Sequence, residues 1–152
     1  MGYLLGVVSD SHGSLAAISR VAPLLAGVDA VAHLGDGAAE APALQKLTGL
    51  PVYSVAGNRD GGGAPNELVE TLGGARVFLS HGHRSHVKAT LLFLALRAQE
   101  LEARVALYGH THVPAVNWRE GVLLVNPGAL RDGRYATVEF GENGPVPRLL
   151  QM

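Results

Sequence analysis

Two histidines separated by one residue, His110 and His112, stand in the sequence YGHTHVP. The run that leads into them, RVAL, is apolar and typical of a strand. In an extended segment residues i and i+2 project to the same side, so this spacing predicts two parallel imidazoles in one cleft. Such a pair suits metal binding. The alternative is a pair of polar residues that merely ends a strand.

Polar residues of the same kind follow four other apolar runs. Asp10 and His12 follow YLLGVVS, Asp36 follows DAVAHLG, Asn58 follows PVYSVAG, and His81 follows ARVFLS. Each alone has an ordinary explanation as a helix cap, a turn residue or a hydrogen-bonded histidine. Because open α/β sheets bind ligands at the carboxyl ends of their strands, the shared position predicts that all of them converge on one crevice.

The elements that would position these residues alternate along the chain. A helix is predicted from Leu15 to Leu25, which Pro23 should kink or shorten, and a short helix over EAPALQKLTG. The strongest helical pattern covers HVKATLLFLALRAQELEA, with His86 at its start. ELVETL, AVNWREGVLLVN and RYATVEF indicate further strands, and the first three strands are expected to be parallel. The pattern predicts one α/β or α+β domain over residues 1–152, with sheets covered on both sides.

Composition excludes several kinds of protein. The chain has 152 residues, is 47% hydrophobic and carries a formal net charge of -1, so no basic field indicates nucleic acid as an obligate partner. It has no cysteine, which excludes disulfides, thiolate zinc sites and a cysteine nucleophile. Its apolar runs are too short for a membrane span or a signal peptide, so we expect no membrane partner and a cytoplasmic location.

In this order, the blocks DSH, GD, GN, HGH and GHTH resemble the signature motifs of the calcineurin-like metallophosphoesterases. The short chain and the late NPGAL block resemble the small bacterial and archaeal phosphodiesterases called the YfcE-like branch. The resemblance runs from about Leu5 to Phe140. It implies a four-layer α-β-β-α sandwich, in which two mixed β-sheets are flanked by helices. It also implies two divalent transition metals per chain, Mn²⁺ foremost and Fe, Zn, Co or Ni as alternatives.

The resemblance implies that seven side chains hold the two metals. One metal is held by Asp10, His12 and His112, the other by Asn58, His81 and His110, and Asp36 bridges both. The implied reaction is hydrolysis of a phosphoester by a metal-bridging hydroxide, with Asp36 and Asn58 in catalytic positions.

The GN block departs from one pattern of the superfamily. Many of its phosphomonoesterases have a histidine directly after the asparagine, as general acid, but this chain has Arg59 there. Arginine stays protonated and cannot supply a proton, so we expect Arg59 either to clamp a phosphate oxygen or to be solvated. His83 is expected either to contact the substrate or to orient His81.

Four other residues receive supporting roles. Asp60 is expected to cap or brace its loop, and His33 either to pack within the second strand or to support a metal-binding residue from behind. Asn126 either reaches the site or, more simply, forms a turn. Trp118 is expected to pack or to make a subunit contact.

The resulting hypothesis is a phosphodiesterase for a small phosphoester. The enzyme alternatives are a phosphomonoesterase and a dinucleotide polyphosphate hydrolase. The other alternative is a protein-binding scaffold, because a retromer subunit with this fold acts mainly as a platform with an altered metal site. The complete ligand set favours an enzyme. The oligomeric state stays open, a homo-oligomer being one alternative.

Overall fold

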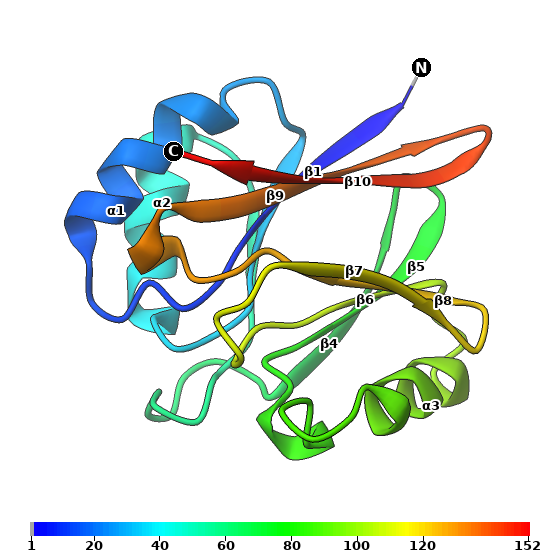
Figure 1. Ribbon diagram of the computed structural model, residues 1–152. Coiled ribbons are helices and arrows are strands. Elements are labelled where there is room, and N and C mark those ends of the chain that lie inside the picture. The colour runs from blue at the N-terminus through cyan, green and yellow to red at the C-terminus, as the bar shows by residue number, and fades with distance from the viewer. Residues whose placement is uncertain (1) are drawn as a thin grey trace.

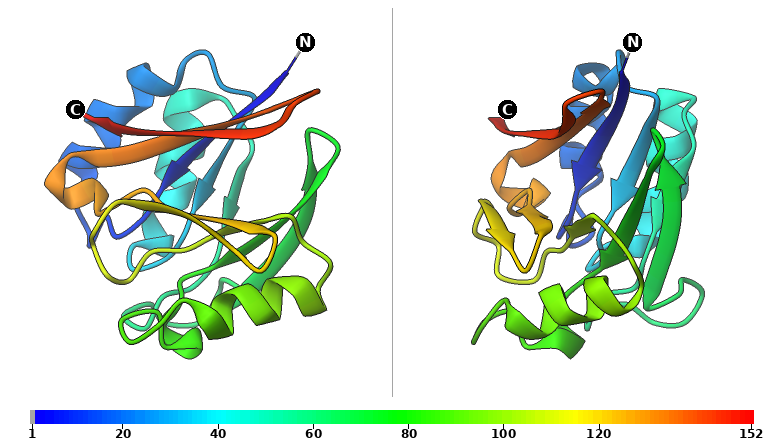
Figure 2. Two further views of the ribbon diagram at one scale, coloured as in Figure 1. Left: turned by 45° about the vertical axis from the view of Figure 1, so that its right-hand side comes forward. Right: turned by 90° about the vertical axis from the view of Figure 1, so that its right-hand side faces the viewer.

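The computed structural model describes residues 2–152 and contains two five-stranded β-sheets packed face to face, with helices on their outer faces (Figures 1 and 2). The strands of the first sheet are β1 (Tyr3–Val8), β2 (Ala30–His33), β3 (Val52–Ser54), β9 (Arg134–Gly141) and β10 (Gly144–Gln151). Those of the second sheet are β4 (Glu67–Leu72), β5 (Ala75–Ser80), β6 (Val105–Leu107), β7 (Ala115–Arg119) and β8 (Val122–Asn126).

Both sheets are mixed, as expected from the sequence. The first has the order β10-β9-β1-β2-β3, in which β1, β2 and β3 are parallel and β9 is antiparallel to β1. The second has the order β4-β5-β6-β8-β7, in which β5, β6 and β8 are parallel. Parallel neighbours have their carboxyl ends at the same edge of a sheet. The polar residues of the motifs follow the strands at that edge.

The helices cover the outer faces of the sheets. α1 (Leu15–Val21) and α2 (Ala41–Thr48) pack on the first sheet, and α3 (Leu92–Glu100) packs on the second. Pro23 lies in a 3₁₀ turn that continues α1, so its expected shortening effect is confirmed. Short 3₁₀ turns cover Ala22–Leu25, Ala38–Glu40, His83–Ser85 and Leu130–Asp132. No helix within residues 2–152 is long and apolar enough to cross a lipid bilayer.

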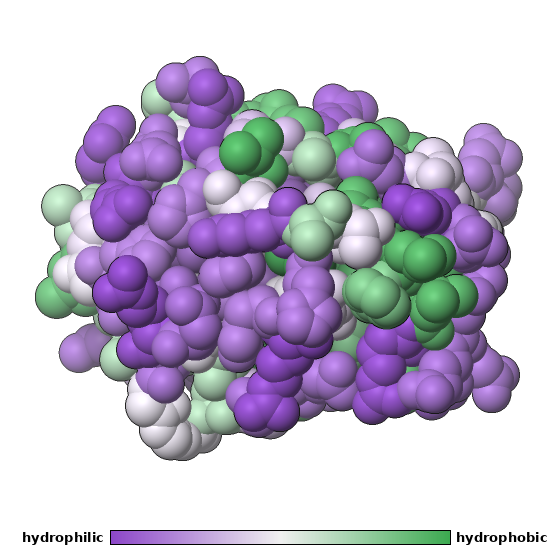
Figure 3. Space-filling view, turned by 60° about the horizontal axis from the view of Figure 1, so that its bottom comes forward, coloured by the Kyte–Doolittle hydropathy of each residue, from purple (hydrophilic) through white to green (hydrophobic). Residues whose placement is uncertain are grey.

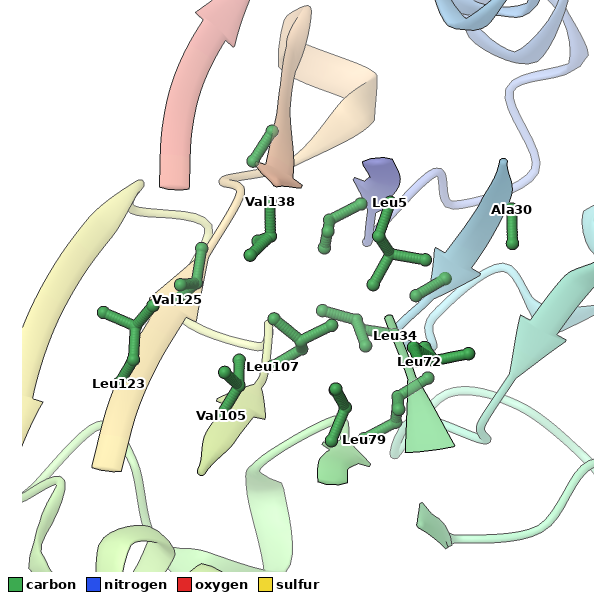
Figure 4. Packing of buried hydrophobic residues seen from close by; sticks show 14 of the residues in the cluster. Leu5, Ala30, Leu34, Leu72, Leu79, Val105, Leu107, Leu123, Val125 and Val138 are labelled. Carbon is green, nitrogen blue, oxygen red and sulfur yellow. The ribbon is translucent and has the colours of Figure 1, made fainter. Parts of the chain in front are cut away.

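The main core lies between the two sheets, as Figure 4 shows. Leu5 of β1 and Val138 of β9 face Leu79, Leu107 and Val125 of the second sheet across this layer. All five side chains are fully buried, and burying one such side chain contributes about 1.5–3 kcal/mol. This core holds the carboxyl ends of both sets of strands rigidly beside each other.

The helix predicted from His86 is wrong in its first part. α3 begins only at Leu92, and the hydroxyl of Thr90 accepts a hydrogen bond from the Leu92 N–H. His86 has a left-handed backbone (φ 55) and closes a 3₁₀ turn instead of opening a helix. The threonine hydroxyl competes with helical hydrogen bonding, and this is why the apolar periodicity overestimates the length of the helix.

The sequence did not predict β10, because Pro145 and Pro147 argue against a strand. β10 is nevertheless paired with β9 over all eight residues, from Gly144 opposite Gly141 to Gln151 opposite Arg134. It lies at the edge of the first sheet, where a proline nitrogen can face away from the only neighbouring strand.

Candidate metal centre

Five loops meet where β1, β2, β3, β5 and β6 end, and backbone hydrogen bonds join them. The N–H of Asp10 donates to Gly35 (2.9 Å) and the N–H of His12 donates to Asp36 (2.8 Å). The N–H of Gly109 donates to the carbonyl of His81 (2.9 Å), which ties the two loops of the second sheet. The convergence that the strand endings predict is therefore present.

The expected extended conformation of GHTH is wrong. β6 ends at Leu107, and His110 and His112 have left-handed backbones, with φ of 72° and 64°. Asp10 (φ 55), His12 (φ 50) and Asp36 (φ 53) share this conformation. Residues with a Cβ adopt it at a cost of about 1–2 kcal/mol each, and such strain concentrates at functional sites. The turn sends the two histidines to two different groups of side chains.

His112 joins Asp10 and His12 in the first group. Asp10 Oδ1 lies 3.1 Å from His112 Nε2 and 3.4 Å from His12 Nε2, and the two Nε2 atoms are 3.2 Å apart. Asp10 Oδ2 accepts hydrogen bonds from the hydroxyl of Ser9 (2.5 Å) and the N–H of His110 (3.2 Å). Oδ1 is buried without a hydrogen bond, so one oxygen holds the carboxylate in place while the other is free to bind.

His110 lies with His81 in the second group, their ring centroids 5.1 Å apart. The fully buried His81 donates from Nδ1 to the carbonyl of Leu34 (2.7 Å), which selects the tautomer whose Nε2 can bind a metal. Among the described residues this Nε2 has no hydrogen-bond partner, and it lies 3.4 Å from Asp36 Oδ2. Burial, with the nearby His81, Lys88 and His83, lowers the pKa of His110 to about 4, so its imidazole is neutral at pH 7 and able to bind a metal.

Asp36 lies between the two groups. Its Oδ2 is 3.4 Å from His81 Nε2 and 4.0 Å from His12 Nε2, and its Oδ1 accepts the N–H of Arg59 (2.9 Å). A Cβ at Gly57 would lie 2.2 Å from Asp36 Oδ1, so only glycine lets the GN loop approach so closely. Asn58, the next residue, is exposed at the rim of the site.

The donor atoms fit a metal centre. Two sets of side chains place one ligand atom each within 4.8 Å of one another: Asp10, His12 and His112, and Asp10, Asp36 and His81. Within residues 2–152, two buried atoms, Asp10 Oδ1 and His81 Nε2, have no hydrogen-bond partner. A bound metal ion would provide the missing partner for both atoms. Carboxylates with neutral imidazoles suit Mn²⁺, Fe²⁺, Co²⁺ or Zn²⁺.

Asp60 braces the loops, as expected. Its carboxylate accepts the N–H groups of Asp36, Gly37, Ala38 and Gly57, at 2.8, 2.9, 3.2 and 2.8 Å. Burial alone would raise the pKa of Asp60, but these four backbone hydrogen bonds outweigh it and lower the pKa. One carboxylate thus joins the loops after β2 and β3.

Asn126 does more than form a turn. The buried side chain accepts the N–H of Gly128 (2.9 Å) and donates to the carbonyl of Gly109 (3.1 Å) and the hydroxyl of Thr111 (2.9 Å). It therefore fixes the loop that carries His110 and His112.

The sequence did not reveal a buried chain of hydrogen bonds below the DSH loop. His33 Nδ1 accepts the N–H of Gly35 (3.2 Å), so its Nε2 donates to Ser11 Oγ (2.9 Å), and Ser11 donates to Glu40 (2.9 Å). Glu40 also accepts the N–H of Gly13 (2.7 Å). Burial lowers the pKa of His33 to about 4. Ser11 and Glu40 are common residue types, and nothing in their spacing signals this contact.

Arg59 and His83 flank the centre. The exposed Arg59 lines a small cavity of about 250 Å³ together with His12 and Asp36. The ring centroid of His83 lies 5.4 Å from that of His81, and burial followed by the proximity of His81 lowers its pKa. Trp118 is 59% exposed on β7, so the packing suggested for it is absent within residues 2–152.

The calcineurin-like phosphoesterase superfamily domain matches residues 3–141. The chain belongs to this superfamily. It is therefore a metallophosphoesterase by family, a class of hydrolases that uses divalent metal ions, and the resemblance of the five motif blocks is confirmed.

Curated relatives carry the same description. A probable metallophosphoesterase of Bacillus subtilis, YsnB, is 36% identical over 137 residues, which are 88% of this chain and 78% of that protein. A probable metallophosphoesterase of Methanocaldococcus jannaschii is 29% identical over 130 residues, which are 83% of this chain and 67% of that protein.

Solved structures confirm the four-layer fold. A predicted phosphoesterase of Streptococcus pneumoniae superimposes with a TM-score of 0.85 at 33% identity, covering 99% of this chain and 90% of that one. Vacuolar protein sorting 29 of Cryptosporidium parvum superimposes with a TM-score of 0.78 at 19% identity, covering 99% of this chain and 98% of that one, and shares the fold.

Proposed function

We propose that the protein is a phosphodiesterase that hydrolyses small phosphodiesters at a dinuclear centre, with Mn²⁺ as the foremost metal. The observation that carries this proposal is the position of Asp36 Oδ2 between His81 and His12, which belong to two sets of ligand atoms that share Asp10. A carboxylate in that position suits a bridge between two ions.

The proposed ligands follow the two groups of side chains. Asp10, His12 and His112 hold one ion, Asn58, His81 and His110 hold the other, and Asp36 contacts both. The left-handed backbones at five of these seven positions support this assignment, because strain of that kind persists where function requires it. When bound, the metals would activate water and neutralise charge on the phosphoryl oxygens.

The protein's own groups have separate tasks. Asp60 and Asn126 hold the ligand loops, so the ligands are positioned before an ion or a substrate arrives. His81 donates from Nδ1 to the carbonyl of Leu34, which fixes the ring with its Nε2 directed at Asp36. Arg59, at the mouth of the small cavity, provides a fixed cation for a non-bridging or leaving-group oxygen. His83, with its ring 5.4 Å from that of His81, is a further imidazole beside the centre, placed to contact the ester.

The diester preference rests on the residue after Asn58. Arg59 does not donate a proton near neutral pH, so a basic alkoxide leaves slowly, and general acid catalysis is typically worth about 10²–10⁴-fold. Aryl phosphodiesters, such as bis-p-nitrophenyl phosphate, have leaving groups that need little protonation. We therefore expect them to be good substrates and simple alkyl monoesters to be poor ones.

Metal removal tests the proposal. Elemental analysis should find close to two transition-metal ions per chain at saturation, and a chelator should abolish hydrolysis until Mn²⁺ is added. Asp36→Asn should weaken both sites, whereas Glu142→Gln, an isosteric change at an exposed turn residue, should change neither metal content nor rate. Full activity of metal-free Asp36→Asn protein would refute the mechanism. Two tightly held ions without hydrolysis of any phosphoester would favour the scaffold alternative.

A further inference from the structure

A large groove lies beside the metal centre, between α2 and the loop that follows β3. Its volume is about 1090 Å³, and its walls are α2 on one side and residues 60–65 on the other. In Figures 1 and 2 this loop and α2 lie on the same side of the molecule. The eight residues of α2 span about 12 Å at 1.5 Å per residue, so the groove extends well beyond a phosphate group.

The groove has the mixed lining that a ring with polar substituents requires. Small apolar side chains, including Ala41, Pro42 and Pro65, form part of its wall. Gln45 and Lys46 of α2 add polar groups, and Ser54 of β3 contributes a hydroxyl. The oxygen of this hydroxyl is buried and has no hydrogen bond, although such groups are usually paired in proteins.

The groove adjoins the metal centre through Asp60, which also lines the small cavity beside His12, Asp36 and Arg59. Four backbone N–H groups offset the charge of the Asp60 carboxylate. The side chains of Arg59 and Lys46 place positive charge at the two neighbouring cavities. A phosphodiester at the centre can therefore extend its second arm into the groove without meeting an unpaired carboxylate.

We propose that this groove binds the non-leaving arm of the substrate and that the arm is a nucleoside. The inference rests on the proposed function, because it names the substrate class of the same centre. The face of a base lies against the alanine and proline side chains. Its polar edge and the sugar hydroxyl pair with Gln45, Lys46 and Ser54. A methyl or phenyl arm would leave these polar groups without partners, which costs affinity.

Three diesters with the same leaving group test the proposal. They are the p-nitrophenyl phosphate esters of thymidine (at its 5′ position), phenol and methanol. We expect kcat/KM for the thymidine ester to exceed that for the methyl ester by at least about tenfold, with the phenyl ester between them. Gln45→Trp should fill the groove and abolish this preference.

Leu47→Trp is the matched control. Leu47 is the second residue after Gln45 on α2, is 55% exposed and does not line the groove. The same indole added there should leave the preference for the thymidine ester intact. Loss of the preference in this control would mean that the substitution acts through the helix and not through the groove, and would overturn the assignment.

Binding provides a readout that does not depend on hydrolysis. Thymidine 5′-monophosphate added to the metal-free protein should shift the backbone NMR signals of residues 38–65, and Gln45→Trp should prevent these shifts. Equal kcat/KM for the three diesters would overturn the groove proposal and leave the phosphodiesterase proposal standing. Equal kcat/KM for the thymidine and phenyl esters, both above the value for the methyl ester, would show that the groove recognises only an apolar ring. That result would overturn the assignment of the arm as a nucleoside. If no diester is hydrolysed, the proposed function fails, and the NMR shifts still decide whether the groove binds a nucleotide.

Discussion

Replacing His112 by glycine should leave the metal-free protein more stable than replacing it by alanine. Both substitutions remove the same imidazole, which is partly exposed, so neither leaves a closed cavity. The two residues differ in the energy that they need to adopt the backbone conformation of this position, where φ is 64°. Glycine adopts a left-handed conformation freely, whereas the Cβ of alanine clashes there.

The magnitude follows from two opposing terms. The left-handed conformation costs alanine about 1–2 kcal/mol. The greater freedom of the unfolded glycine chain costs His112→Gly about 0.4–1 kcal/mol. The balance favours glycine by about 1 kcal/mol. With a urea m-value of about 2 kcal/mol/M, the midpoint of unfolding should be higher by about 0.5 M in the glycine variant.

Urea unfolding with chelator present, followed by circular dichroism, measures this difference. Gly62→Ala is the control, because φ at Gly62 lies outside the left-handed range and its Cβ would meet no atom within 4 Å. There alanine should be the more stable residue, by about 0.4–1 kcal/mol. Mn²⁺ affinity should fall equally in both His112 variants. A result in which alanine exceeds glycine at both positions would refute the claim that the ligand loop is strained.

Three further predictions concern residues around the centre. Asn126→Ala should destabilise the protein by about 2 kcal/mol and weaken Mn²⁺ binding, because the buried N–H of Gly128 loses its bond to Asn126 and the loop of His110 and His112 loses two bonds; unchanged Mn²⁺ affinity by calorimetry would contradict a positioning role. The pKa of His33 is about 4 in the folded protein and about 6.5 when unfolded, so its share of the stability is full above pH 6.5 and is lost as the pH falls to about 4. His33→Gln should remove about 2 kcal/mol of the change in stability between pH 7 and pH 4.5 in urea unfolding, and an identical pH slope in the variant would exclude His33 as its source. Hydrolysis rates should fall steeply as the leaving-group pKa rises, and a flat plot with chemistry rate-limiting would show that another group, His83 first, donates the proton.

The sequence predicted much of the fold because its parallel strands are buried on both faces. β1 reads as an unbroken apolar run, Leu4 to Val8, and β6 of the second sheet, Val105 to Leu107, does the same. Elements at the surface were harder to predict. The start of α3 was predicted too early, because periodicity carries no information about the hydrogen bond to the Thr90 hydroxyl. β10 was not predicted, because Pro145 argues against a strand and the sequence does not show that this strand lies at an edge.

The candidate ligands could be predicted because each follows a strand with a glycine nearby, as Asp36 follows β2. Their geometry could not. His110 and His112 were expected to project in parallel, but left-handed backbones turn them apart. The supporting contacts, such as that of Ser11 with Glu40, join residues 29 positions apart, and only the folded chain brings them together.

The two prolines of β10 have a consequence for how copies of the protein meet one another. The ladder with β9 is continuous, so the nitrogens of Pro145 and Pro147 must face outward. An exposed strand normally offers a row of N–H donors to any other extended chain, and this one lacks two of them in succession. The long free border of the first sheet is therefore a poor template for adding a strand. We therefore expect that β10, although it is an eight-residue edge strand, does not promote fibrous aggregation at high protein concentration.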